Sequence, residues 1–361
     1  MDVLHVAPIN VAGVPYSMME MQRRSGAHAR LVTLHRNALT FPEDICLDLP
    51  LPRNKAAMLW RSFKREALSR TPHAPSQPPE TFLPIHGPKN FLEALYFRWD
   101  DTRREKTVME ALEKFGLEQF TIIHYDGGLD FFRDARLARR WKKEGKKIVC
   151  HYMGSDLRVR GIDPVMNELS DLNLTNESDH LLRHPAIYYV YIPFDVSPYA
   201  VRSEENERLR IIHSPTSRNA KGTELILPVM EKVKKVRDVE FVLVENRPHH
   251  EVIRIKSTCD IAIEQVGNLG GTGYGRNSLE TLALGIPTIT EMTPDYTAWL
   301  PENPFILATE RTLFQALIDV IDTPSLRAEK RLQGRAWVEK YHSYDAVHSR
   351  LMELYREHLI L

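Results

Sequence analysis

The sequence predicts an α/β protein with two domains, each built on a parallel sheet. The chain has 361 residues, which exceeds one typical domain. In both halves, short apolar runs alternate with glycine-containing loops and amphipathic segments, an order typical of strands and helices in parallel sheets. Prolines and polar residues over 192–198 indicate a boundary. We therefore expect domains at 1–195 and 196–361.

The composition bounds the class of protein. Hydrophobic residues make up 43% of the chain without a long apolar run, which argues for a soluble protein. The first residues lead directly into a strand, so we expect no signal peptide and a cytoplasmic location. Cys46, Cys150 and Cys259 lack metal-ligand spacing and are expected to be buried thiols. The formal net charge of zero gives no general attraction to nucleic acid, so we expect no such partner.

The first strand is expected at 3–7, followed by a loop that contains Gly13, a helix over 16–24 and a strand over 31–34. Ligands of such units bind at the carboxyl ends of the strands. Gly13 is therefore a candidate for close approach by a ligand, and a simple turn glycine is the equally supported alternative.

A helical insertion is expected near 53–115. Residues 55–69 predict a basic amphipathic helix that carries Trp60 and Phe63, and a proline-rich loop follows over 71–88. The favoured interpretation is an aromatic face packed on the domain core with a solvated basic back. The alternative is peripheral contact with an anionic membrane, on its inner face.

Two later strands of the first half end in polar residues. A strand over 120–125 is followed by Asp126, and a strand over 148–151 ends at His151. Catalytic groups gather at such strand ends, and a histidine there can orient a hydroxyl or stabilise positive charge. A hydrogen-bonded structural histidine is the alternative.

The second half repeats this order around basic residues. A strand over 209–213 leads to a loop with Arg218 and Lys221, and a helix is expected over 224–236. Basic side chains beside a helix N-terminus can neutralise a diphosphate.

A glycine-rich loop then joins a strand to a helix. The strand over 261–263 ends at Glu264, and the helix over 276–284 carries Glu280. The loop between them contains Gly267, Gly270, Gly271, Gly273 and Gly275. Free backbone amides and the helix dipole make this a phosphate-binding arrangement. A surface helix with a solvated Glu280 is the alternative.

Three segments resemble one enzyme family. Residues 280–289 (Glu-Thr-Leu-Ala-Leu-Gly-Ile-Pro-Thr-Ile) resemble the signature Glu-Ala-Met-Ala-x-Gly-x-Pro-Val-Ile of GT-B glycosyltransferases of the family 4 type. Residues 151–158 are similar to the element His-x-x-Gly-Ser-Asp-x-Arg of divergent members, and 213–223 to the donor element. The resemblance implies two Rossmann-like domains facing across a cleft, with C-terminal helices packing back over the domain junction.

The resemblance also implies an activity and a site. The activity is sugar transfer from a nucleotide-diphosphate sugar, UDP- or GDP-linked, to a hydroxyl of a carbohydrate, a lipid-linked or a small-molecule acceptor. It implies a hexosyltransferase that retains configuration, and the absence of an Asp-x-Asp motif predicts no metal and no cofactor. The implied catalytic residues are His151, Lys221 and Arg218. The implied donor-binding residues are Gly13, Ser214, Lys221, Glu245, Gly271, Thr272, Gly273, Tyr274, Gly275, Arg276, Asn277, Ser278 and Glu280. Candidates on the acceptor side are Asp126, Gly154, Asp156 and Arg158.

The sequence departs from the family pattern at two places. The family has a second Glu eight positions before Glu280, where this chain has Thr272. The family Arg stands five or six positions before Lys221, where this chain has Thr216 and Pro215, so Arg218 is expected to substitute. These departures leave two alternatives: a GT-B nucleotide-sugar epimerase, or a non-catalytic binding or scaffold protein.

Overall fold

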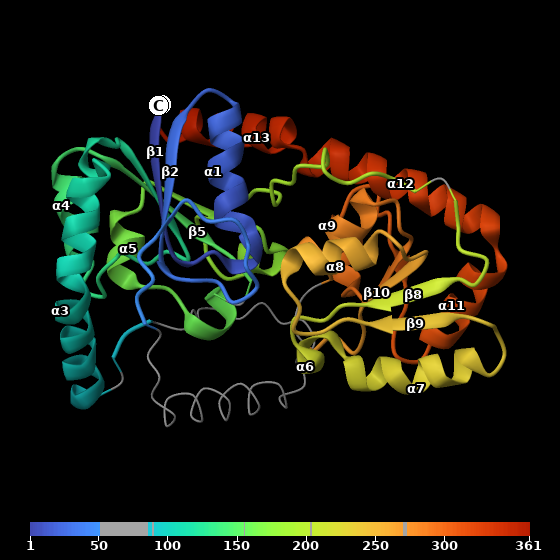
Figure 1. Ribbon diagram of the computed structural model, residues 1–361. Helices are drawn as coiled ribbons and strands as arrows, with labels where there is room; N and C mark the ends of the chain where they lie inside the picture. Colours follow the sequence, from blue (N-terminus) through green and yellow to red (C-terminus); the bar gives the residue numbers. More distant parts are fainter. Residues whose placement is uncertain (51–85, 89, 155, 203, 270–272) are drawn as a thin grey trace. The chain divides into compact units, whose positions relative to one another are not determined.

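The computed structural model describes residues 1–50, 86–88, 90–154, 156–202, 204–269 and 273–361 (Figure 1). These residues form two compact units, Met1–Pro193 with Val347–Leu361 and Phe194–Ala346. Each unit contains one sheet, and every strand pairing in both sheets is parallel. The predicted α/β class with parallel sheets is confirmed. The predicted helix over 55–69 and the loop over 71–85 lie outside the described residues.

The first unit has a seven-stranded sheet of order β3-β2-β1-β4-β5-β6-β7. Its order reverses between β1 and β4, and at such a switch point loops diverge and leave room for polar side chains. The strands are β1 (Asp2–Ile9), β2 (His28–His35), β3 (Ile45–Cys46), β4 (Ile122–Asp126), β5 (Lys147–Tyr152), β6 (Leu172–Thr175) and β7 (Tyr188–Tyr189).

Helices cover both faces of this sheet (Figure 1). They are α1 (Val14–Arg24), α3 (Phe91–Lys114), α4 (Arg136–Lys143), α5 (Pro164–Leu169) and α13 (Tyr344–Glu357). Gly13 has φ 70° at the N-cap of α1, and Pro15 occupies the first turn, where its missing N–H leaves no bond unmade. Gly13 is therefore required by the turn that starts α1.

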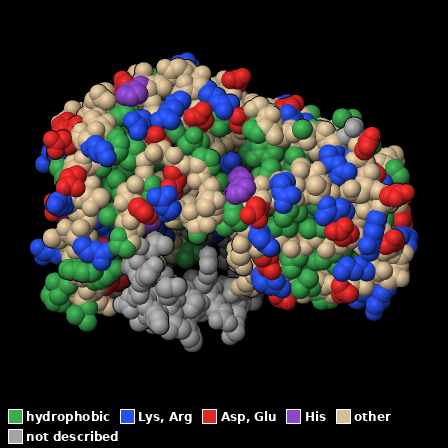
Figure 2. Space-filling view, in the orientation of Figure 1, with side chains coloured by type: hydrophobic (Ala, Val, Ile, Leu, Met, Phe, Trp, Pro, Cys, Tyr) green, Lys and Arg blue, Asp and Glu red, His purple; other side chains and the backbone are tan. Residues whose placement is uncertain are grey.

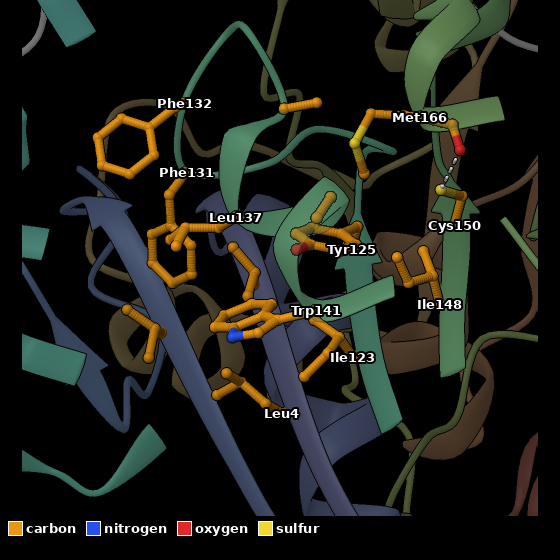
Figure 3. Close-up of a cluster of buried hydrophobic side chains, with 14 of the residues drawn as sticks. Leu4, Ile123, Tyr125, Phe131, Phe132, Leu137, Trp141, Ile148, Cys150 and Met166 are labelled. Atoms are coloured by element: carbon orange, nitrogen blue, oxygen red, sulfur yellow. Dashed lines mark hydrogen bonds between the residues drawn. The ribbon is translucent and has the colours of Figure 1, made fainter. Parts of the chain in front are cut away.

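The core of the first unit surrounds Trp141 of α4 (Figure 3). Its indole is fully buried and meets the Phe131 ring edge-on, with the ring centroids 6.3 Å apart. Cys150 of β5 is also buried in this cluster, and its thiol lies 3.8 Å from the carbonyl oxygen of Met166. Large aromatic side chains supply most of the apolar area buried here, which fixes α4 against the sheet.

The second unit has a five-stranded sheet of order β12-β11-β10-β8-β9. The first strand, β8, lies between β10 and β9, so the order again reverses beside it. The strands are β8 (Arg210–His213), β9 (Glu240–Leu243), β10 (Ile261–Gln265), β11 (Thr288–Thr290) and β12 (Ile306–Leu307).

Helices again pack in two layers, with α7 beside α11 and α9 beside α12 (Figure 1). The helices are α6 (Arg218–Lys221), α7 (Thr223–Lys234), α8 (His249–Lys256), α9 (Arg276–Ala283), α10 (Pro294–Trp299), α11 (Leu313–Asp322) and α12 (Pro324–His342). Ile226, Leu313 and Leu317 are fully buried where α7 and α11 meet the sheet. The short elements α6, α10, β3 and β12 were not predicted.

The last segment of the chain belongs to a different unit from the one predicted. The sequence predicts one domain over 196–361, whereas the structure groups Val347–Leu361 with the first unit. Leu351, Leu354 and Tyr355 are fully buried there, and the Gln22 amide donates to the Tyr355 hydroxyl at 3.4 Å. Apolar residues on one face of α13 find their partners beside α1, which chain order alone does not reveal.

The surface carries both signs of charge. Figure 2 shows acidic and basic side chains interspersed over the visible face, in keeping with the formal net charge of zero. Within the part of the chain that the structure describes, no helix combines the length and apolar character that a membrane span needs.

Candidate functional site

The loops that follow β8, β9 and β10 leave the same edge of the second sheet, because the three strands are parallel neighbours. Ser214 follows β8, Glu245 lies just beyond β9, and Gln265 ends β10. Polar side chains from separate parts of the sequence are thereby brought to the switch point of the sheet, the usual place for ligands in such folds.

Gly222 allows a close approach at this edge. It has φ 66° and joins α6 to α7, and a Cβ atom built on it would lie 2.0 Å from the backbone oxygen of Val266. A glycine is therefore required where the α6–α7 junction meets the end of β10. Lys221, expected in a loop beside a helix N-terminus, is the last residue of the short helix α6 and lies beside the N-terminus of α7.

Lys221 is held by two acidic or polar partners. Its ammonium contacts the Glu264 carboxylate and donates to Gln265 Oε1 at 3.1 Å. Asn277 Nδ2 donates to the other oxygen of Glu264 at 2.5 Å. Burial alone would raise the pKa of Glu264, but the Lys221 ammonium and these hydrogen bonds outweigh it and hold the pKa below its ordinary value. Glu264 is thus an anion that neutralises Lys221.

Glu280 lies on α9 with its side chain 4% exposed. Lys256 and Arg276 form ion pairs with it, Arg276 Nε at 3.4 Å, and His249 Nε2 lies 2.7 Å from Glu280 Oε1. Burial opposes ionisation, but the Lys256 charge and the His249 contact lower the pKa of Glu280 to about 2. The carboxylate is therefore charged at neutral pH, which excludes a merely solvated surface glutamate.

Asn277 connects these two acidic groups. Its Oδ1 accepts hydrogen bonds from Ser214 Oγ at 2.8 Å and from Lys256 Nζ at 2.5 Å, while its Nδ2 donates a hydrogen bond to Glu264. The predicted residues Ser214, Lys221, Asn277 and Glu280 are therefore brought together in one network.

Three members of this network, Glu264, Lys256 and His249, are not among the site residues predicted from the sequence. Glu264 could have been found as a charged residue at the end of an apolar strand. Lys256 stands four positions after Val252 on α8, so the two side chains lie on the same face of the helix. A charged residue on an apolar helix face is a signal that could have identified Lys256. His249, at the start of the same helix, carries no comparable signal.

Arg218 and Glu245 also meet. Arg218 Nη1 donates to Glu245 Oε2 at 2.7 Å, and Arg218 Nε donates to Glu224 Oε1 at 2.8 Å. Glu245 therefore acts here as an acidic partner of Arg218, whose charge is shared between two carboxylates.

The described end of the glycine-rich loop leads into α9. Thr290 Oγ1 donates to the Gly273 carbonyl at 2.7 Å, and the Tyr274 ring stacks on Tyr296 with centroids 5.8 Å apart. Gly275 is the N-cap of α9, and the buried Ser278 donates its backbone N–H to Gly275 at 3.0 Å. Tyr274 thus anchors the loop in an aromatic cluster. Gly271 and Thr272 lie outside the described residues.

A second polar cluster lies inside the first unit. Asp126 at the end of β4 is fully buried between His5 of β1, whose Nδ1 lies 3.0 Å away, and His151 of β5, whose Nδ1 lies 3.2 Å away. Burial opposes its ionisation, but the nearby His124 imidazole and the hydrogen bonds from His151 and His5 hold the pKa of Asp126 well below its usual range. His151 Nε2 is buried and has no hydrogen-bond partner among the described residues.

Three residues of this cluster have side-chain atoms of the kinds that can bind a metal ion. The ligand atoms of His5, His124 and Asp126 lie within 4.8 Å of one another, close enough to hold a metal ion. His5 and His151 already donate to the two oxygens of the carboxylate. Asp126 therefore supports the histidines from inside the sheet, whereas the sequence analysis expected it on the acceptor side.

The remaining candidates follow β5. Gly154 has φ 52°, and Asp156 accepts a hydrogen bond from the Met153 N–H at 2.9 Å. Arg158 donates to Glu177 at 3.1 Å and to Asp179 at 2.5 Å. Asp156 and Arg158 therefore fold the loop after His151, and the Arg158 charge is matched by two carboxylates.

Comparisons with protein-family models and with curated proteins find no match to this sequence. Solved structures do match it. HepE from Anabaena in complex with UDP-glucose is 11% identical, covers 99% of this chain and 100% of its own, and has a TM-score of 0.58. An α-glucosyltransferase in complex with UDP and DNA is 10% identical, covers 98% of both chains and has a TM-score of 0.58. TarM is 10% identical, covers 98% of this chain and 99% of its own, and has a TM-score of 0.56. The chain therefore has the fold of GT-B glycosyltransferases.

Proposed function

We propose that the protein is a glycosyltransferase that moves a sugar from a nucleotide-diphosphate sugar to a hydroxyl acceptor. The observation that carries this proposal is the meeting of Lys221, Asn277 and Glu280 at the carboxyl ends of parallel strands. A cation, an amide and a charged carboxylate at one sheet edge suit a ligand with both phosphate and hydroxyl groups. The UDP and UDP-glucose complexes among the similar structures support a uridine nucleotide as the first donor to test.

The nucleoside end of the donor is assigned to Glu280. Its carboxylate is charged and fixed by basic neighbours, and each carboxylate oxygen can accept more than one hydrogen bond. In the proposed complex the ribose hydroxyls donate to this carboxylate.

The diphosphate end is assigned to Lys221 and to the N-terminal amides of α7 and α9. As the bond between the sugar carbon and the phosphate oxygen breaks, the electron pair goes to the diphosphate and the sugar becomes cationic. Fixed positive groups stabilise the departing charge without reorganising. The acceptor hydroxyl then bonds to the sugar carbon, and its proton passes to the departing diphosphate oxygen. The proposal keeps retention of configuration, no metal requirement, and His151 on the sugar side, with its Nδ1 bound by Asp126.

The first test is thermal denaturation with UDP, GDP, ADP, dTDP and their common sugars. A ligand at a hundredfold excess over its dissociation constant stabilises the folded protein by about 2.7 kcal/mol. We expect stabilisation by one nucleotide class in the wild type and its loss in Lys221→Met. Lys234→Met, on the partly exposed end of α7, is the matched control and should keep the shift.

The alternatives give different results. A scaffold protein would show no stabilisation by any nucleotide. A nucleotide-sugar epimerase would convert the donor without an acceptor, and proton NMR of the donor sugar alone would reveal the product. A transferase consumes donor in step with an added carbohydrate or lipid-linked acceptor.

A further inference from the structure

Lys256, the last residue of α8, is completely buried. A buried ammonium group loses its hydration and is tolerated only when charge and hydrogen-bond partners replace the water. Lys256 Nζ contacts the Glu280 carboxylate and donates to the side-chain oxygen of Asn277 at 2.5 Å. Among the described residues, the polar contacts of this ammonium group therefore go to Asn277 and Glu280, which are already assigned to the proposed donor site.

These contacts continue to Lys221. Asn277 Nδ2 donates to Glu264, and Glu264 pairs with Lys221. Cationic and anionic side chains alternate in this series of contacts. Lys221 pairs with Glu264, and beyond Asn277 Lys256 pairs with Glu280. The two ends are the residues assigned to the diphosphate and to the ribose. Lys221 has its own direct contacts with Glu264 and Gln265, whereas Glu280 contacts Lys256 directly.

We propose that Lys256 is a positioning residue that holds the Glu280 carboxylate and the Asn277 amide in the orientation that receives a nucleoside. This inference rests on the proposed function. Lys256 lies beneath the site, whereas the side chains of His249 and Arg276 are 19% and 15% exposed and approach Glu280 from the rim. A carboxylate fixed from below needs no reordering when hydroxyl groups arrive, and such preorganisation strengthens binding.

The first measurement needs no ligand. Carbon NMR of labelled glutamate follows the titration of Glu280. Lys256 and His249 face this carboxylate from α8, and Arg276 faces it from α9. In Lys256→Met we expect the Glu280 midpoint to rise by about one pH unit or more, because the nearest cation is gone. Lys256→Arg should restore it. An unchanged midpoint in Lys256→Met would overturn the inference.

The second measurement separates positioning from general damage. Calorimetry compares UDP, which has a ribose, with inorganic pyrophosphate, which has none and would meet only Lys221 and the helix amides. We expect Lys256→Met to weaken UDP binding about tenfold and to leave pyrophosphate binding unchanged, with recovery in Lys256→Arg. An equal loss for both ligands would mean a structural role only, and would also overturn the inference.

The double variant Lys256→Met/Glu280→Gln replaces the ion pair by two neutral side chains of similar size. It should fold, because neither partner is left as an unpaired buried charge. It should bind pyrophosphate as the wild type does and bind UDP as weakly as Lys256→Met. Retained UDP affinity in the double variant would contradict the positioning role. If the wild type binds neither UDP, GDP nor pyrophosphate, the proposed function fails, and the Glu280 titration still decides whether Lys256 governs that carboxylate.

Discussion

Asp130 shows how burial alters the charge of a single residue. The side chain lies beneath the start of α4, and its Oδ2 accepts backbone hydrogen bonds from Leu137 at 3.0 Å and from Ala138 at 3.4 Å. Burial raises the pKa of Asp130 to about 7, although these and other hydrogen bonds oppose the rise. The folded protein therefore holds this proton more tightly than the unfolded chain, whose aspartates titrate near about 4.

This difference predicts a pH dependence of stability. A raised folded pKa gives a contribution that is complete below about pH 4 and is lost as the pH rises to about 7. Between pH 5 and 7 the wild type should lose about 2–3 kcal/mol from this residue. Asp130→Asn keeps an oxygen for the backbone amides and cannot titrate. Urea unfolding at both pH values should show the variant gaining that amount relative to the wild type.

The exposed Asp134 provides the control, since its carboxylate is 55% exposed beside Arg136. Asp134→Asn should follow the pH profile of the wild type. If Asp130→Asn did so as well, the buried Asp130 would have an ordinary pKa and the argument from burial would be wrong.

At this scale the sequence predicted the residues that follow local patterns. Lys221 and Glu280 were found because each stands at a strand-to-helix junction or in a helix signature. Lys256 was not predicted, because its partner Glu280 lies 24 positions away in the sequence. The pairing of Lys221 with Glu264 was not predicted either, because it spans 43 positions. Side-chain contacts between separate βα units depend on how the helices pack, which single-residue patterns do not encode.

At the scale of elements, the α6–α7 junction depends on Gly222. Gly222→Ala would place a methyl group against the Val266 backbone oxygen and strain a left-handed φ. We expect a loss of about 3 kcal/mol or more in the free energy of unfolding, because the Val266 backbone directly follows the central strand β10 and cannot move aside. Chemical denaturation measures this loss.

Gly26 is the matched control. It also has a positive φ, 87°, but a Cβ atom there would meet nothing within 4 Å. Gly26→Ala should cost only about 1 kcal/mol, the conformational part of the change. Equal losses at the two positions would show that the approach to Val266 is not a tight contact.

Helices and strands were predicted correctly where the periodic pattern of apolar residues extends over several residues. The strand predicted over 261–263 and the helix predicted over 276–284 lie within a residue or two of the bounds of β10 and α9. The four-residue α6 and the two-residue β3 and β12 were missed. Such short elements are stabilised by neighbours, such as the pairing of β12 with β11, and carry no period of their own.

At the scale of the whole molecule, the chain order and the division into units differ. The last helix follows α12 of the second unit, yet its buried residues belong to the first unit. Tyr188 of β7 also meets His358 edge-on, with ring centroids 4.6 Å apart. The predicted domain over 196–361 included this helix by its position in the chain alone, because an amphipathic face indicates burial but does not identify the surface against which it packs.

This division predicts which unit loses stability when α13 is altered. Leu351 is fully buried, whereas Leu359, eight positions later, is 73% exposed. Leu351→Ala removes the same atoms as Leu359→Ala, but leaves a cavity in the first unit and should cost about 2–5 kcal/mol. Leu359→Ala should cost less than about 0.5 kcal/mol. Hydrogen exchange followed by mass spectrometry should show faster exchange in β1 and β4 for Leu351→Ala, with β8 and β10 unchanged. Faster exchange confined to β8 and β10 would instead assign α13 to the second unit, as chain order suggested.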